Sequence, residues 1–196
     1  MLQPNNYQHI IIMEKRILSI LTLISFIILL SGCLTVERKE YTFELTGDNS
    51  GRLTIRYINI MSILDDGQDV SGDDFEELIN TYLNGTSIED EYPMATVVSK
   101  KLYEQDNQLC AEVIIEFTDL ASVKLHQFDP NSGYFHVIPS GGFVNERFDN
   151  TNGQYASDEV PIIRWLSAVR KLEFSTILNE PDEDTVSLLP YFLEMK

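Results

Sequence analysis

Apolar residues alternate with polar residues over several stretches of the chain beyond residue 40. The alternation runs through residues 41–45 and again through 53–57, and a run of Gly, Asp, Asn and Ser separates the two stretches. A period of two is typical of a strand with one buried face, so these stretches predict a hairpin. Residues 109–117 extend the pattern, with five apolar side chains on one face and Glu112 and Glu116 on the other. Short strands separated by turns predict an antiparallel sheet.

One segment has helical rather than strand periodicity. Residues 71–84 place five apolar side chains on a single stripe, namely Phe75, Leu78, Ile79, Tyr82 and Leu83. Ser71 or Asp73 can cap this helix, and Gly85 can end it. A short C-terminal helix is expected at residues 190–195, where Pro190 fits the first turn. The predicted fold class is therefore α+β, mostly antiparallel β-sheet with about 6–8 strands and one main helix. A β-sandwich is the alternative.

A different pattern precedes residue 33. Residues 13–16 are Met-Glu-Lys-Arg, and the 14 residues 17–30 contain nothing more polar than Ser and Thr. A membrane-spanning helix needs about 20 apolar residues, so this stretch is too short to be one. The chain then continues with the small pair Ser31-Gly32 and with Cys33. A basic start, a short apolar core and small residues follow the order of a secretory signal peptide.

The motif Leu30-Ser31-Gly32-Cys33 resembles the lipobox of bacterial lipoproteins. In that family a diacylglyceryl group is attached to the cysteine sulfur, a signal peptidase cuts just before the cysteine, and the new amino group is often acylated. The resemblance implies that residues 1–32 are a signal peptide, whose true start can be Met13. It also implies that Leu30, Ser31 and Gly32 are recognition residues and that Cys33 is lipidated. The alternatives are an ordinary secretory signal with a chance cysteine, or an uncleaved anchor.

The same resemblance implies a location. The protein is expected in the bacterial cell envelope, held to the lipid bilayer through acyl chains on Cys33. Leu34 rather than an aspartate follows the cysteine, which favours the outer membrane in Gram-negative lipoproteins. Residues 33–39 are expected to form a lipidated tether that reaches roughly 20 Å when fully extended. Residues 40–196 are expected to form a single globular domain.

Charge and cysteine content narrow the function classes. The formal net charge is −17, and removing residues 1–32, with two basic residues and one acidic residue, makes it −18. Such a charge argues against nucleic acid as a partner and favours a basic or envelope protein. Cys110 is then the only cysteine left beside Cys33, so no intramolecular disulfide is expected. Because Cys110 lies in an apolar run, we interpret it as a small buried hydrophobe.

Acidic residues form the first candidate site. Residues 65–91 contain ten carboxylates and no Lys or Arg. Convergent carboxylates are typical ligands of calcium, although the spacing here is not that of an EF-hand loop. A solvated acidic face at a helix start is the simpler interpretation, and a docking surface for a basic partner is another. This acidic patch comprises Asp65, Asp66, Asp69, Asp73 and Asp74.

Two histidines form the second candidate site. If the strands pair symmetrically about the turn at residues 129–133, His126 lies directly opposite His136. The preceding strand then brings Glu112 or Ile114 beside His126. Two histidines and one carboxylate with an open position form a zinc ligand set. The alternative is a cross-strand histidine pair with no metal.

No motif of nucleophilic catalysis supports an enzyme. The chain after residue 33 contains neither a G-x-S-x-G nor a Ser-x-x-Lys sequence, and it has no phosphate-binding loop. We therefore interpret the protein as a membrane-anchored envelope lipoprotein with a non-enzymatic binding domain, no catalytic residues and no cofactor. A metal-dependent hydrolase using His126 and His136 is one alternative. A calcium-binding surface protein is the other.

Overall fold

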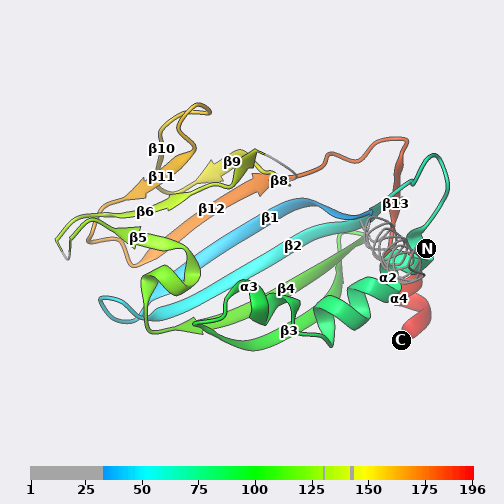
Figure 1. The fold of residues 1–196 in the computed structure, drawn as a ribbon, viewed down its shortest axis with the longest axis horizontal. Helices are drawn as coiled ribbons and strands as arrows, with labels where there is room; N and C mark the ends of the chain where they lie inside the picture. The colour runs from blue at the N-terminus through cyan, green and yellow to red at the C-terminus, as the bar shows by residue number, and fades with distance from the viewer. Residues whose placement is uncertain (1–32, 130, 142–143) are drawn as a thin grey trace, which may run out of the picture. The chain divides into compact units, whose positions relative to one another are not determined.

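The computed structural model describes residues 33–129, 131–141 and 144–196 (Figure 1). The predicted signal peptide, with Leu30, Ser31 and Gly32, lies outside the described residues. Among the described residues, no helix is long and apolar enough to cross a membrane.

A seven-stranded antiparallel sheet is the largest element of the fold (Figure 1). Its strands follow the order β3-β4-β2-β1-β12-β9, and β13 pairs with β2. All of its strand pairs are antiparallel. The prediction of a mostly antiparallel sheet is confirmed. The bounds are β1 (Leu34–Leu45), β2 (Gly51–Ile63), β3 (Thr96–Gln105), β4 (Gln108–Phe117), β9 (Arg147–Thr151), β12 (Lys171–Ile177) and β13 (Thr185–Ser187).

The predicted hairpin is formed by β1 and β2, with Leu45 paired to Gly51 and Phe43 to Leu53. Gly51 is required at this close approach, because a Cβ atom there would lie 2.3 Å from the carbonyl oxygen of Glu44. The first strand is longer than expected. It begins at Leu34, which pairs with Ser62, so residues 34–39 belong to the sheet and do not form a tether ahead of the domain.

A smaller four-stranded sheet packs on one face of the large one. Its order is β10-β11-β6-β5, and its side chains share one core with β1, β2, β4 and β12. The core is rich in aromatic contacts, with the rings of Tyr41 and Phe174 stacked 4.4 Å apart. The remaining strands are β5 (Leu125–Gln127), β6 (Tyr134–Val137), β7 (Ser140–Gly141), β8 (Val144–Asn145), β10 (Gln154–Tyr155) and β11 (Ile162–Trp165).

The segment predicted as one amphipathic helix consists of two helical pieces. Residues Ser71–Glu77 form the α-helix α2, and Leu78–Leu83 continue as the π-helix η2. The expected N-caps Ser71 and Asp73 are not used, because Val70 occupies the N-cap position and no side chain caps α2. At the other end, η2 stops at Leu83 with Asn84 as its C-cap, and Gly85 follows directly. The other helices are α3 (Ser87–Glu91), the 3₁₀-helix η3 (Leu120–Val123) and α4 (Leu189–Met195).

A second apolar cluster lies where α2, η2 and α4 meet β1, β2 and β4. It contains Val36, Ile60, Leu78, Leu109 and Phe192 among its buried residues. Figure 1 shows α2 and α4 side by side, and the stacked rings of Phe75 and Tyr191 join them at 5.6 Å. Burying an apolar side chain of this size contributes about 1.5–3 kcal/mol, so these contacts hold the helices to the sheet.

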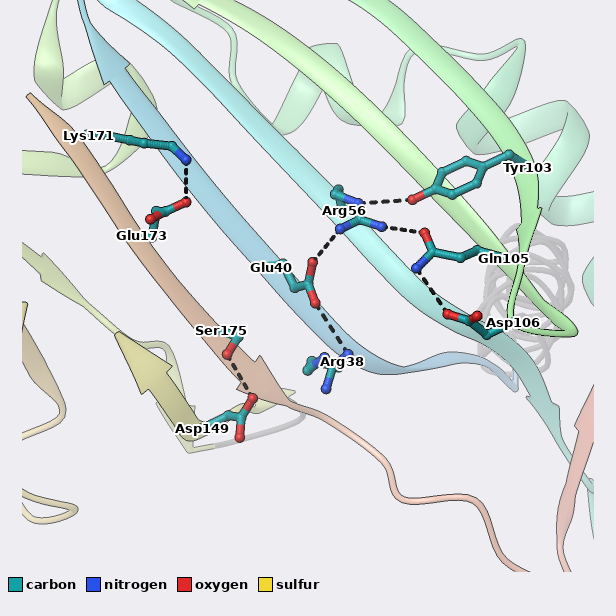
Figure 2. Close-up of polar contacts among 10 residues, drawn as sticks. All are labelled: Arg38, Glu40, Arg56, Tyr103, Gln105, Asp106, Asp149, Lys171, Glu173 and Ser175. Carbon is teal, nitrogen blue, oxygen red and sulfur yellow. Dashed lines mark hydrogen bonds and ion pairs between the residues drawn. The ribbon is translucent and has the colours of Figure 1, made fainter. Parts of the chain in front are cut away.

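The opposite face of the large sheet carries polar side chains (Figure 2). Arg56 lies at the centre of this face and donates to Tyr103 at 3.0 Å, to Glu40 at 2.9 Å and to Gln105 at 2.6 Å. The alternation seen in the sequence thus separates a buried face from a face of polar cross-strand pairs. A hollow of about 570 Å³ lies at the end of the sheet near the turn between β1 and β2, and charged residues of this face, among them Glu44, Arg52 and Glu116, line it.

Candidate functional site

A cavity of about 660 Å³ opens on the covered face of the large sheet. This volume is within the range of about 300–1,000 Å³ that is typical of small-molecule sites. The sheet contributes one wall, and η2 with the start of α3 contributes the other. The principal apolar residues are Leu34, Val36, Tyr57, Ile60, Leu102 and Ala111 from the sheet, and Leu78, Tyr82, Leu83 and Ile88 from the helices.

The sheet wall of the cavity depends on a shift in the alternation of side chains along β1 and β2. Asn59 has a φ of 57°, and its side chain donates to Glu37 on the neighbouring strand at 2.8 Å. A left-handed residue inside a strand shifts the alternation of its side chains. As a result Val36 and Ile60, which have even numbers, line the same cavity as Tyr57, which has an odd number.

The cavity explains why several apolar residues are only half-buried. Tyr57, Leu102 and Ala111 lie beside one another on adjacent strands of the large sheet, yet each keeps an intermediate exposure. Tyr82, which the helical stripe places among core residues, is 36% exposed. These side chains line the cavity, and those of Tyr57, Leu102 and Ala111 also pack against the second apolar cluster. The apolar stripe predicted for residues 71–84 therefore faces the cavity as well as the packed core.

One end of the cavity reaches a buried ion pair. Nζ of Lys39, which lines the cavity, lies 2.7 Å from Oε1 of Glu146, whose side chain is only 3% exposed. The hydroxyl of Thr176 also donates to Glu146, at 2.9 Å. The same lysine lies 5.9 Å from the ring centre of Tyr57. Sequence reading missed this pair because Lys39 and Glu146 are 107 residues apart.

The tyrosines around the cavity remain neutral over the ordinary pH range. Burial raises the pKa of Tyr57, and the charge of Glu91 raises it further. Burial is also the largest cause of the raised pKa of Tyr82, followed by Glu77 and then Glu91. Neutral hydroxyl groups can donate hydrogen bonds, whereas they are poor nucleophiles. Apart from the tyrosines, the polar residues among the described residues that line the cavity are Thr, Asn, Lys and Glu, with no Ser, Cys or His.

The remaining charged groups at the cavity are paired. Lys100 donates to the carbonyl of Gly85 at 2.6 Å and lies 3.0 Å from Glu89, which fastens α3 to β3. Lys101 lies 2.7 Å from Glu112 on the neighbouring strand, on the sheet face that carries Arg56. Within the described residues, the lysines at this cavity therefore all have acidic partners.

The predicted pairing of the two histidines is wrong. Strands β5 and β6 pair His126 with Phe135 and Leu125 with His136, one residue away from the expected register. A shift of one residue moves a side chain to the other face of a strand, so the histidines lie on opposite faces. Glu112 lies in β4 of the other sheet and pairs with Lys101. The expected zinc ligands His126, His136 and Glu112 are thus not brought together.

The acidic patch does not converge on one point either. Asp65 and Asp66 lie in an exposed turn, whereas Asp69 accepts hydrogen bonds from the backbone and hydroxyl of Ser71. Asp74 is buried and accepts from the hydroxyl of another serine, and Asp73 is exposed. In the part of the chain that the structure describes, no three His, Cys, Asp or Glu residues are placed to hold a metal ion.

Cys33 lies at the edge of this site. Its carbonyl oxygen accepts a hydrogen bond of 2.8 Å from the backbone of Ile63, so the strand pairing extends to the cysteine itself. Cys33 is half-buried, and burial raises the pKa of its thiol, with a smaller contribution from Asp74. The next residue, Leu34, already lines the cavity. The predicted lipidation site is therefore the immediate neighbour of the cavity wall.

Comparison with known proteins does not assign this chain to a family. The chain matches no protein family, no curated protein and no solved structure.

Proposed function

We propose that this protein is a lipoprotein of the bacterial cell envelope, anchored through Cys33, and that its domain is a non-enzymatic binding module whose ligand site is the cavity. One observation carries the proposal. The lipobox cysteine directly precedes Leu34, a residue that lines an apolar cavity of about 660 Å³. The proposed anchor, Cys33, is thus adjacent to the proposed binding site.

The sequence motif supports the anchor. A basic start, a short apolar core and Leu30-Ser31-Gly32-Cys33 follow one another in the order of a lipoprotein signal. Two or more acyl chains hold a protein stably on a bilayer, whereas one chain does not. Leu34 after the cysteine favours the outer membrane if the bacterium is Gram-negative.

The composition of the cavity supports binding rather than catalysis. Aliphatic and tyrosine side chains form most of its wall, and its lysines are held by carboxylates. A largely apolar wall with few polar groups is typical of sites for small apolar molecules.

Metabolic labelling tests the anchor. In bacteria that express the full chain and are fed an alkyne-bearing fatty acid, we expect label on the wild-type protein and its loss in Cys33→Ser. Cys110→Ser is the matched control and keeps the label, because Cys110 is 1% exposed and lies inside β4. Equal labelling of Cys33→Ser and wild type would contradict the proposal.

A further inference from the structure

The cavity is apolar, yet no side chain of the described chain fills it. Tyr57, Leu102, Ala111 and Leu178 line it and remain half-buried, although closely packed interiors leave few voids larger than a water molecule. Exposed apolar surface is unfavourable in water in proportion to its area. The arrangement therefore favours an occupant that is itself apolar.

The ion pairs around the cavity favour an uncharged occupant. Lys39 is paired with Glu146 and Lys100 with Glu89, whereas the pair of Lys101 and Glu112 lies on the outer face of the sheet, in register with Arg56. Glu91, an acidic residue of the wall, is likewise paired with a lysine, Lys124. A charged ligand would have to displace one of these partners, whereas a hydrocarbon chain leaves all of them in place.

The position of the cavity indicates where such a chain would come from. Leu34, Thr35 and Val36, the three residues after Cys33, all line the cavity. The carbonyl of Cys33 is fixed by the backbone of Ile63, so no flexible linker separates the cysteine from the sheet. A group attached at Cys33 is therefore confined near the cavity at a high effective concentration.

We propose that the cavity holds one of the acyl chains attached to Cys33. This inference rests on the proposed lipidation of that residue. A diacylglyceryl group with an acylated amino group supplies three chains, and two chains suffice for stable anchoring. One chain can thus occupy the cavity while the others remain in the bilayer. A chain that moves from the bilayer into the cavity exchanges one apolar environment for another largely apolar one, which limits the hydrophobic free energy lost in the transfer.

Photo-cross-linking of the intact lipoprotein tests this directly. Bacteria that express the full chain are fed a fatty acid carrying an alkyne and a diazirine, and the labelled protein is irradiated in the membrane and digested. We expect intramolecular cross-links from the lipid of Cys33 to peptides from η2 and β4. Ala111→Trp, which fills the sheet wall, is expected to abolish them. Ile114→Trp, on the opposite face of β4, is the matched control and keeps them.

Each other outcome overturns a distinct part of the inference. Label on Cys33 with cross-links only to membrane lipids would overturn the cavity assignment and leave the lipidation intact. Absence of label on Cys33 would overturn the proposed function itself. Cross-links of labelled phospholipids to the cavity peptides in Cys33→Ser would show that the cavity takes lipids of the bilayer instead. If Ala111→Trp does not fold, as judged by proteolysis, Leu83→Trp on the helical wall replaces it.

Discussion

At the scale of single residues, His136 shows how the core sets the charge of a side chain. It is 5% exposed, its ring lies 4.7 Å from that of Phe174, and Nδ1 lies 2.9 Å from the carbonyl oxygen of Lys124. The neutral ring can donate Nδ1–H to that carbonyl. Burial lowers the pKa of His136 to about 4. The folded protein therefore holds this histidine neutral at pH values where the unfolded chain protonates it.

A pH dependence of stability follows. Because the folded-state pKa of His136 is about 4 and the usual value is 6.5, the unfolded state binds the extra proton between these values. The stability that depends on a neutral His136 is fully present above about pH 6.5 and is lost as the pH falls toward 4. Over this range the free energy of unfolding is expected to fall by roughly 3 kcal/mol in total. Urea unfolding at several pH values, for the wild type and His136→Phe, measures it. The same slope in both proteins would attribute the pH dependence to other groups.

The ion pair between Lys39 and Glu146 gives a second residue-scale prediction. Lys39→Met leaves the buried carboxylate of Glu146 without its cation, and we expect the free energy of unfolding to fall by roughly 3 kcal/mol. The double variant Lys39→Met/Glu146→Gln removes both charges and keeps an acceptor for Thr176, so it should recover most of that loss. Urea unfolding of the wild type, Lys39→Met, Glu146→Gln and the double variant gives the coupling energy. A double variant no more stable than Lys39→Met would contradict the pairing.

At the scale of elements, the change in side-chain alternation at Asn59, inside β2, shapes the sheet wall of the cavity. Asn tolerates the left-handed conformation better than most residues, because its short polar side chain can hydrogen-bond locally. Here that side chain contacts Glu37 on the next strand. Nothing in the local sequence marks the change of phase, since Asn59 stands inside a run of strand-forming residues.

Two substitutions at Asn59 separate the backbone from the side chain. Asn59→Gly and Asn59→Val both remove the hydrogen bond to Glu37, but only Val is strained at a φ of 57°. We expect Asn59→Val to be less stable than Asn59→Gly by about 1–2 kcal/mol, despite the preference of Val for strands. Chemical denaturation of the two variants measures the difference. Equal stabilities would mean that the strand does not require a left-handed residue at this position.

At the scale of the whole molecule, the excess of acidic residues opposes folding. The chain has 31 acidic against 14 basic side chains, and its exposed ion pairs, such as Arg147 with Glu180, each contribute little. Like charges repel one another in the compact state, and salt screens that repulsion. The net effect of salt on stability is therefore expected to be positive.

Raising the sodium chloride concentration from about 10 to 100 mM shortens the Debye length from about 30 to 10 Å. We expect Tm to rise by about 2–4 °C, equivalent to roughly 1 kcal/mol for a domain of this size. Thermal unfolding at matched ionic strength in magnesium and calcium chloride is the control. A further rise with calcium alone would identify a specific site in the acidic patch, and a fall of Tm with salt would contradict the charge argument.

The sequence by itself determined the local features of this protein. Alternation with a period of two located the hairpin of β1 and β2 and the long strand β4, because one face of each strand is buried. The apolar run around Cys110 indicated its burial. The lipobox pattern is also local, since it depends only on residues that follow one another, and it led to the proposed anchor.

Tertiary structure decided everything that depends on distant residues meeting. The ion pair of Lys39 and Glu146 spans 107 positions, and no local pattern encodes it. The hairpin containing His136 pairs one residue away from the symmetric register, which reversed the face of one histidine and removed the zinc set. The cavity exists because the left-handed residue in β2 and the helical wall of η2 leave a space between them. Periodicity predicts which side of an element is apolar, but only packing determines whether that side meets a neighbour or a cavity.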